Sequence, residues 1–272
     1  MVDQAAERSL QQIHDLLNND SITQGKEYKL RVAQGLVPGT AIFEKYGKNP
    51  SIATGLEDVW NGGGLFTGFP TGAAETMEIF SSSGDDTLLG DGARTVRVMN
   101  LLDADGAVSP NVDVELDGAN PVSLGAIPYF RGGSRIIVLT AGNDDDNAGT
   151  LTLRHTVTTA NIFAVLPINR NQTAIGAFTV PLGKTLFMDR ATMSMVRSAA
   201  AAASAETTFR ARPLGQVFNA IFSPTISTSQ DWKFEDNGWL EFAALTDIKM
   251  RVESVTATAV VAGEFSGLLV DD

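Results

Sequence analysis

The 272-residue chain contains no cysteine. Thiolate zinc sites, disulfide scaffolds, cysteine nucleophiles and iron–sulfur clusters are therefore excluded, because each requires a cysteine sulfur. Histidine is nearly as scarce, with only His14 and His155. Neither imidazole is accompanied by a Gly-x-Ser-x-Gly elbow or a His-Glu-x-x-His motif, and we expect His155 to be a polar strand residue. The sequence thus predicts no catalytic residue, no metal ligand and no cofactor-binding residue.

Positive charge is also scarce, since 20 Lys and Arg residues stand against 32 Asp and Glu residues, for a formal net charge of −12. An acidic chain repels phosphate backbones, so we expect no nucleic-acid partner. Residues 150–215 are an exception, because seven basic residues there outnumber two acidic ones. This asymmetry is either scatter over a large surface or a basic face that mates with an acidic face of another copy. The seven basic residues are Arg154, Arg170, Lys184, Arg190, Arg197, Arg210 and Arg212.

Long apolar runs are absent. The longest have four or five residues, as at 136–139, whereas about 20 are needed to cross a bilayer. The first residues also lack the basic and apolar regions of a secretory signal peptide. We therefore expect a soluble protein without a membrane partner. Only 19% of the residues are charged and 26 are glycine, a composition that favours a β-rich fold.

Residues 4–17 are predicted to form a helix, because Leu10, Ile13, Leu16 and Leu17 recur at helical spacing and Asp3 can cap the first turn. A helix of this length needs a docking partner, either the body of the chain or a neighbour. Residues 21–64 carry scattered glycine and proline and are expected to be an extended arm and linker.

Beyond Leu65 the chain changes to short alternating segments separated by Asp, Asn and Gly turns, the pattern of antiparallel sheets. Residues 249–257 largely alternate between polar and apolar side chains, which predicts a strand with one buried face. The predicted fold is all-β, with two antiparallel β-sandwich, jelly-roll-like lobes after an N-terminal helix and arm. The expected divisions are 1–64, 65–170 and 171–272. The expected strands are 75–81, 93–102, 112–116, 135–141, 150–157, 161–167, 174–181, 185–196, 207–212, 216–222, 240–245, 248–261 and 264–270.

Two acidic motifs resemble parts of cation sites. Asp103 and Asp105 precede Gly106 as in the opening of a calcium loop, but Ala107 and Val114 occupy later ligand positions, which favours a turn. A second run, Asp144 to Asp146, is interpreted as a solvated loop tip.

Glycine motifs and aromatic residues receive similar interpretations. Gly62 to Gly64 are expected to form a hinge rather than a phosphate loop, and Gly183-Lys184-Thr185 lacks the spacing of one. Four aromatic residues are either a sugar-stacking platform or, as we expect, packing residues. They are Trp232, Phe234, Trp239 and Phe242.

Several strand segments resemble a family of virion structural proteins of tailed phages, notably marine ones. The resemblance spans about residues 57–272 and contains no catalytic residues. It implies a non-enzymatic β-sandwich subunit of a capsid or tail. The segments that carry it are 57–60, 62–64, 74–79, 90–98 (GDGARTVRV), 147–155 (NAGTLTLRH), 161–185 and 245–270.

The resemblance and the composition together predict a capsid decoration or cement protein. We expect it to act as a homo-oligomer, with a trimer as one arrangement, and to contact the major capsid protein or other virion proteins. Its expected location is the virion, assembled in the cytoplasm of a bacterial host. The alternatives are a tail or head-fibre subunit that contacts the host surface and, in another class, a carbohydrate-binding module or polysaccharide-degrading enzyme.

Overall fold

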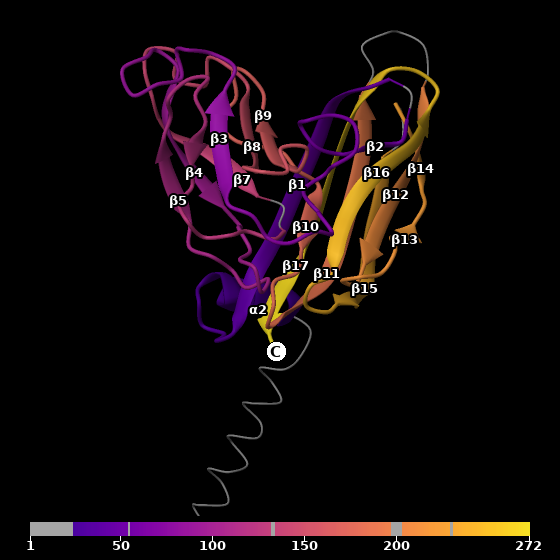
Figure 1. The fold of residues 1–272 in the computed structure, drawn as a ribbon. Coiled ribbons are helices and arrows are strands. Elements are labelled where there is room, and N and C mark those ends of the chain that lie inside the picture. Colours follow the sequence, from indigo (N-terminus) through magenta and orange to yellow (C-terminus); the bar gives the residue numbers. More distant parts are fainter. Residues whose placement is uncertain (1–23, 54, 132–133, 197–202, 229–230) are drawn as a thin grey trace, which may run out of the picture.

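A computed structural model describes residues 24–53, 55–131, 134–196, 203–228 and 231–272. The described chain is all-β, as predicted, with antiparallel sheets and one short helix, α2 (Gln24–Ala33). Figure 1 shows two groups of strands that diverge from a common base near α2 and the C-terminus. We call strands β3 to β9 the first lobe, and strands β1, β2 and β10 to β17 the second lobe.

The first lobe consists of two sheets. Alternate residues are buried along its strands β3 and β8, so each strand turns one row of side chains inward. One sheet has the order β6 (Val122–Ser123), β3 (Met77–Ser81), β8 (Leu151–His155) and β9 (Ile162–Leu166). The other has the order β5 (Val112–Glu115), β4 (Ala93–Met99) and β7 (Arg135–Ala141).

Side chains from both sheets fill the interior of the first lobe. Ile79, Leu153 and Phe163 come from the first sheet and are fully buried. Val96 and Ile136 come from the second sheet and belong to the same hydrophobic cluster. The first lobe is therefore a sandwich of two sheets around a shared core.

The second lobe is also a two-sheet structure. One sheet has the order β1 (Thr40–Ile52), β17 (Ala259–Asp271), β11 (Lys184–Val196) and β15 (Trp232–Phe242). The other has the order β10 (Ala177–Thr179), β16 (Asp247–Val255), β12 (Ser204–Arg212) and β13 (Asn219–Phe222). In this second sheet β14 (Thr225–Ser227) also pairs with β12, and β2 (Glu57–Asp58) pairs with β16.

Large apolar side chains from both sheets meet in the second core. The fully buried rings of Phe209 and Phe265 pack edge to face with centroids 5.3 Å apart. The backbone of β1 approaches the backbone before β10 closely at Gly47. A Cβ atom on Gly47 would lie only 2.3 Å from the backbone nitrogen of Gly176. Only glycine at position 47 allows β1 to run this close to the chain that leads into β10.

The expected arm over residues 21–64 is wrong for its central part. Residues 24–33 form α2, and residues 40–52 form β1, which pairs with β17 from Thr40 opposite Val270 to Ile52 opposite Ala259. Pro50 had suggested a linker, but the pairing register shifts between Asn49 and Ile52 and so accommodates a proline there. The helix expected over residues 4–17 lies outside the described residues.

The other differences concern strand bounds and short strands, and the longest is β15, which begins at Trp232 and not at Leu240. The single strand expected over 248–261 is two strands, since β16 ends at Val255 and β17 begins at Ala259. Strands β2, β6 and β14 have two or three residues, too few to show a period in the sequence. The divisions at residues 64 and 170 stay predictions. The first-lobe strands lie in the chain between β2 and β10, both of which pair within the second lobe.

Candidate functional site

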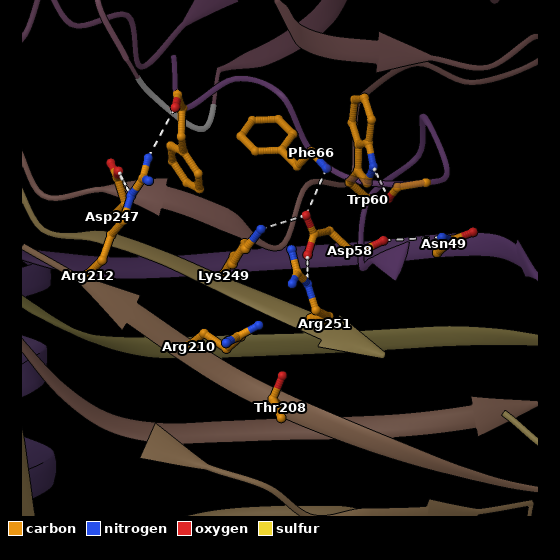
Figure 2. Close-up of polar contacts among 12 residues, drawn as sticks. Asn49, Asp58, Trp60, Phe66, Thr208, Arg210, Arg212, Asp247, Lys249 and Arg251 are labelled. Carbon is orange, nitrogen blue, oxygen red and sulfur yellow. Dashed lines mark hydrogen bonds and ion pairs between the residues drawn. The ribbon is translucent and has the colours of Figure 1, made fainter. Parts of the chain in front are cut away.

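The candidate site lies between the two lobes, on the polar face of the sheet that contains β12 and β16. Phe209 and Met250 of these strands point into the core of the second lobe. Their neighbours Arg210, Lys249 and Arg251 lie on the opposite face, where Asp58 of β2 bonds to Lys249 and Arg251 (Figure 2). The inter-lobe ion cluster on this face consists of Asp58, Arg131, Arg212, Asp247, Lys249 and Arg251.

Asp58 is the centre of one half of the cluster. Its carboxylate accepts hydrogen bonds from Lys249 Nζ at 2.9 Å, Arg251 Nε at 2.8 Å and the backbone N–H of Phe66 at 2.8 Å. The side chain of Asp58 is 1% exposed and that of Lys249 is 5% exposed. Burial lowers the pKa of Lys249, and the Asp58 carboxylate opposes this shift. The pair is therefore a buried ion pair with its hydrogen bonds satisfied.

Asp247 is the centre of the other half and joins the two lobes directly. It pairs with Arg131, which precedes β7 of the first lobe, and with Arg212 Nε at 2.8 Å. Thr179 Oγ1 donates to its second oxygen at 2.7 Å. Arg212 also donates to the backbone oxygen of Phe69 at 3.1 Å. Burial raises the pKa of Asp247, while both guanidinium groups and Thr179 lower it.

Aromatic rings surround these charges and exclude water. Phe218 lies against both the Arg212 guanidinium, 4.4 Å from the ring centroid, and Lys249 Nζ, at 4.6 Å. Phe218 also contacts Phe69, which with Phe66 belongs to the core of the first lobe. Charges from the second lobe are thus covered by apolar groups continuous with the first core. The arrangement can hold the lobes together.

The alternation over residues 249–257 correctly predicts a strand with an apolar buried face as far as Val255, where β16 ends. The finding beyond that prediction is that the polar face is covered as well, since Lys249 is 4% exposed. The register places Arg210 opposite Lys249 and Thr208 opposite Arg251. Cations on facing positions repel each other unless an anion lies between or beside them. Asp58 supplies that anion from a distant part of the sequence.

His155 lies on β8, the strand position that the sequence predicts, and is fully buried. Its Nε2 lies 3.1 Å from the backbone oxygen of Tyr129, which can only accept, so Nε2 carries the proton. Its Nδ1 accepts from Asn161 Nδ2 at 3.2 Å. Burial lowers the pKa of His155, against the Tyr129 hydrogen bond and the Glu75 carboxylate, which raise it. The imidazole is thus a neutral packing group. His14 lies outside the described residues.

Acid is expected to weaken the fold through His155. The folded chain resists protonation there, so the free energy of unfolding decreases as the pH falls below about 6.5, by up to about 1.4 kcal/mol per pH unit until the lowered pKa is reached. Denaturant unfolding between about pH 7 and pH 5 measures this slope. The H155Q variant, whose amide does not titrate, should show a flatter slope. Equal slopes for the wild type and H155Q would contradict a lowered pKa of His155 in the folded chain. Glu75 also has a lowered pKa, mainly through Thr158, but its effect begins only below about pH 4.5.

The acidic motifs are turns, as expected. Asp103 Oδ1 accepts from the backbone N–H of Asp105 at 3.0 Å and of Ala107 at 2.9 Å, so the carboxylate closes its own loop. Asp144 and Asp145 are exposed at a loop tip. Within the described ranges, no three His, Asp or Glu side chains are grouped as a metal site would require.

The glycine motifs also have structural roles. Gly63 and Gly64 adopt φ of 67° and 60°, which closes a tight turn where a hinge was expected. The backbone oxygen of Gly64 accepts from the backbone N–H of Asp58 at 2.9 Å and from Trp60 Nε1 at 3.2 Å, which ties the turn to the ion cluster. At the other motif, Lys184 begins strand β11 and pairs with Asp271.

The four aromatic residues do not form one platform. Phe242 is buried in the second core, and Trp232 and Phe234 pack on Phe222 with centroids 5.3 and 4.6 Å away. Trp239 is 46% exposed, with Lys29 Nζ 5.8 Å from its ring centroid. Packing is therefore the main use of this group, as expected.

Most basic residues of the 150–215 segment form ion pairs within the chain. This pairing argues against a basic face that mates with another copy. Arg197 lies outside the described residues, and no ion pair is found for Arg170 within the described part. The pairs are Arg154 with Glu78, Lys184 with Asp271, Arg190 with Glu264, Arg210 with Glu253 and Arg212 with Asp247. No helix among the described residues has the length and apolar character needed to cross a membrane.

The fold and the cluster define a two-lobed, all-β protein whose lobes are joined by buried ions. No protein-family model and no curated protein matches the chain. Among solved structures, it is weakly similar to the infectious bursal disease virus Gt strain, with 10% identity, a TM-score of 0.23, and coverage of 86% of this chain and 74% of that chain. The Gx strain gives 7% identity, a TM-score of 0.23, and coverage of 85% and 72%.

The VP2 subviral particle of the same virus gives 8% identity, a TM-score of 0.12, and coverage of 89% of this chain and 86% of that chain. With scores this low, the likeness gives no basis for an argument about function.

Proposed function

We propose that the chain is a non-enzymatic structural protein of a tailed-phage virion, a capsid decoration or cement subunit. It acts as a homo-oligomer and contacts the major capsid protein. The assignment to a virion is supported by the strand segments between residues 57 and 272 that resemble that family. The assignment to an assembling subunit is supported by one structural observation, described next.

This observation is a set of exposed apolar side chains on α2, the turn that follows it and β1, which we call the apolar strip. Among residues 28–33 of α2, only Val32 is buried in the described chain, while Leu30 is 57% exposed. Leu36, in the turn before β1, is 59% exposed. We infer a protein contact here, because these large apolar side chains stay exposed along one short stretch of the chain. The members of the strip are Tyr28, Leu30, Leu36, Ile42 and Tyr46.

The double variant Leu30→Asp and Leu36→Asp is expected to abolish self-association without unfolding the protein. Both side chains are exposed in the described chain, so the free energy of unfolding should change by no more than about 0.5 kcal/mol per site. Two new charges in a contact that excludes water would prevent its formation. Sedimentation velocity measures the association, and denaturant unfolding measures the stability.

The matched control is Leu89→Asp, because Leu89 is 91% exposed on a loop of the first lobe, away from the strip. This variant should associate as the wild type does. If the double variant associates normally, or if the wild type is monomeric at every concentration, a homo-oligomer built on the strip is ruled out.

The place in the particle is tested by counting copies of the protein in purified virions by quantitative mass spectrometry. Hundreds of copies per particle support a component of the head lattice. A dozen or fewer would support the tail or head-fibre alternative instead, and absence from the particle would overturn the proposal.

A further inference from the structure

A second feature at the junction of the lobes is a cationic pocket with a volume of about 260 Å³. One wall is β1 of the second lobe, with Lys45. The opposite wall is the first lobe, with Asn100 after β4 and Arg135 at the start of β7. Gln172 and Thr173, in the connection between β9 and β10, complete the lining. The pocket therefore takes polar groups from both lobes and from the chain that joins them.

Lys45 and Arg135 are the charges that define this pocket. Lys45 is 8% exposed, and its pKa is lowered to about 7, first by burial and then by the nearby positive charge of Arg135. The positive charge of Arg135 opposes protonation of Lys45 in this partly enclosed space, and an anion between the two side chains would favour the protonated lysine. Arg135 also donates to Gln172 Oε1, which fixes the position of its guanidinium group.

Other charged groups lie in or near the pocket. Glu44 lines it and is exposed on β1. Arg170 and Glu264 are close enough to Tyr46 to shift its pKa in opposite directions, Arg170 downward and Glu264 upward, while burial raises it most. The lining thus contains two basic side chains with amide and hydroxyl groups, the donor set that binds oxyanions in proteins, and one carboxylate, that of Glu44.

We propose that this pocket binds a small oxyanion, a phosphate or a carboxylate, between Lys45 and Arg135. The bound anion contacts both lobes and therefore fixes their relative position. Its source is either a free ion or a carboxylate side chain of another copy of the chain. The proposal does not depend on the protein being a virion component.

The test is isothermal titration of inorganic phosphate into the full chain at constant ionic strength. The wild type should bind, and R135Q and K45M should each bind at least about ten-fold more weakly, because each loses a charge-assisted hydrogen bond. The control is R97Q, which removes an exposed guanidinium from β4, outside the pocket. Unfolding curves of each variant confirm that it is folded.

Equal phosphate binding by R97Q and R135Q, or none by the wild type, would overturn the proposal. Sedimentation velocity then separates the two sources. If phosphate dissociates an oligomer of the wild type, the natural anion is a carboxylate of another copy. If phosphate binds without changing the sedimentation coefficient, the natural anion is a free ion.

Discussion

Replacing Asp58 by alanine is expected to destabilise the protein by about 3–5 kcal/mol. The carboxylate is the common acceptor for Lys249, Arg251 and the backbone N–H of Phe66, and its removal leaves two cations under the aromatic cover without their partner. The cost is that of uncompensated buried charge rather than of one lost contact. The midpoint of urea unfolding, followed by circular dichroism, measures it.

An exposed ion pair of similar geometry provides the control. Arg97 and Asp113 form two hydrogen bonds of 2.7 and 2.8 Å on the surface of the first lobe. The variant Asp113→Ala should leave the unfolding midpoint unchanged within error, because water replaces the lost partner. If D58A and D113A move the midpoint equally, burial does not determine the strength of the Asp58 cluster.

A further variant separates the cost of stranded charge from the loss of the contact between β2 and β16. Replacing Asp58, Lys249 and Arg251 together by apolar residues of similar volume should recover much of the stability that D58A loses, since no buried charge remains. A triple variant as unstable as D58A would show instead that the ion pairs themselves hold β2 on β16.

Strands with clear alternation were predictable because the alternation is local. Strand β7 has the predicted bounds, and β11 begins within one residue of the predicted position. β1 was not predictable in this way. It contains Gly47 and Pro50, which locally favour a loop, and its partner β17 lies more than 200 residues along the chain. Its stability comes from that pairing, which no window of sequence contains.

The candidate site shows the same limit. The sequence displays alternating cations at residues 210–212 and 249–251. It does not show that Arg210 lies opposite Lys249 on the neighbouring strand. Register is the missing information, since only register shows that these cations need a nearby anion. Given the register, Asp58 would still have been one of 32 acidic residues. Its role follows from β2 pairing with β16, a contact of two residues.

Replacing Asp86 by alanine is expected to cost on the order of 3 kcal/mol or more, because several buried donors lose their acceptor together. Asp86 is fully buried in the first lobe. Its carboxylate accepts from the backbone N–H groups of Ala93, Ala148 and Gly149 at 2.7 to 2.8 Å, and from the hydroxyl of Ser81. Asp86 thereby connects the loop after β3 to the loop before β8 through hydrogen bonds.

The control for Asp86 is Asp103→Ala, since Asp103 also accepts from two backbone N–H groups but lies in a half-exposed turn. Water can reach those donors, so this variant should cost about 1 kcal/mol or less. Amide hydrogen exchange distinguishes the two mechanisms, because D86A should release the protected amides of Ala148 and Gly149 while β3 and β8 stay protected. If these amides remain protected in D86A, other contacts hold the two loops together, and the carboxylate merely occupies the space between them.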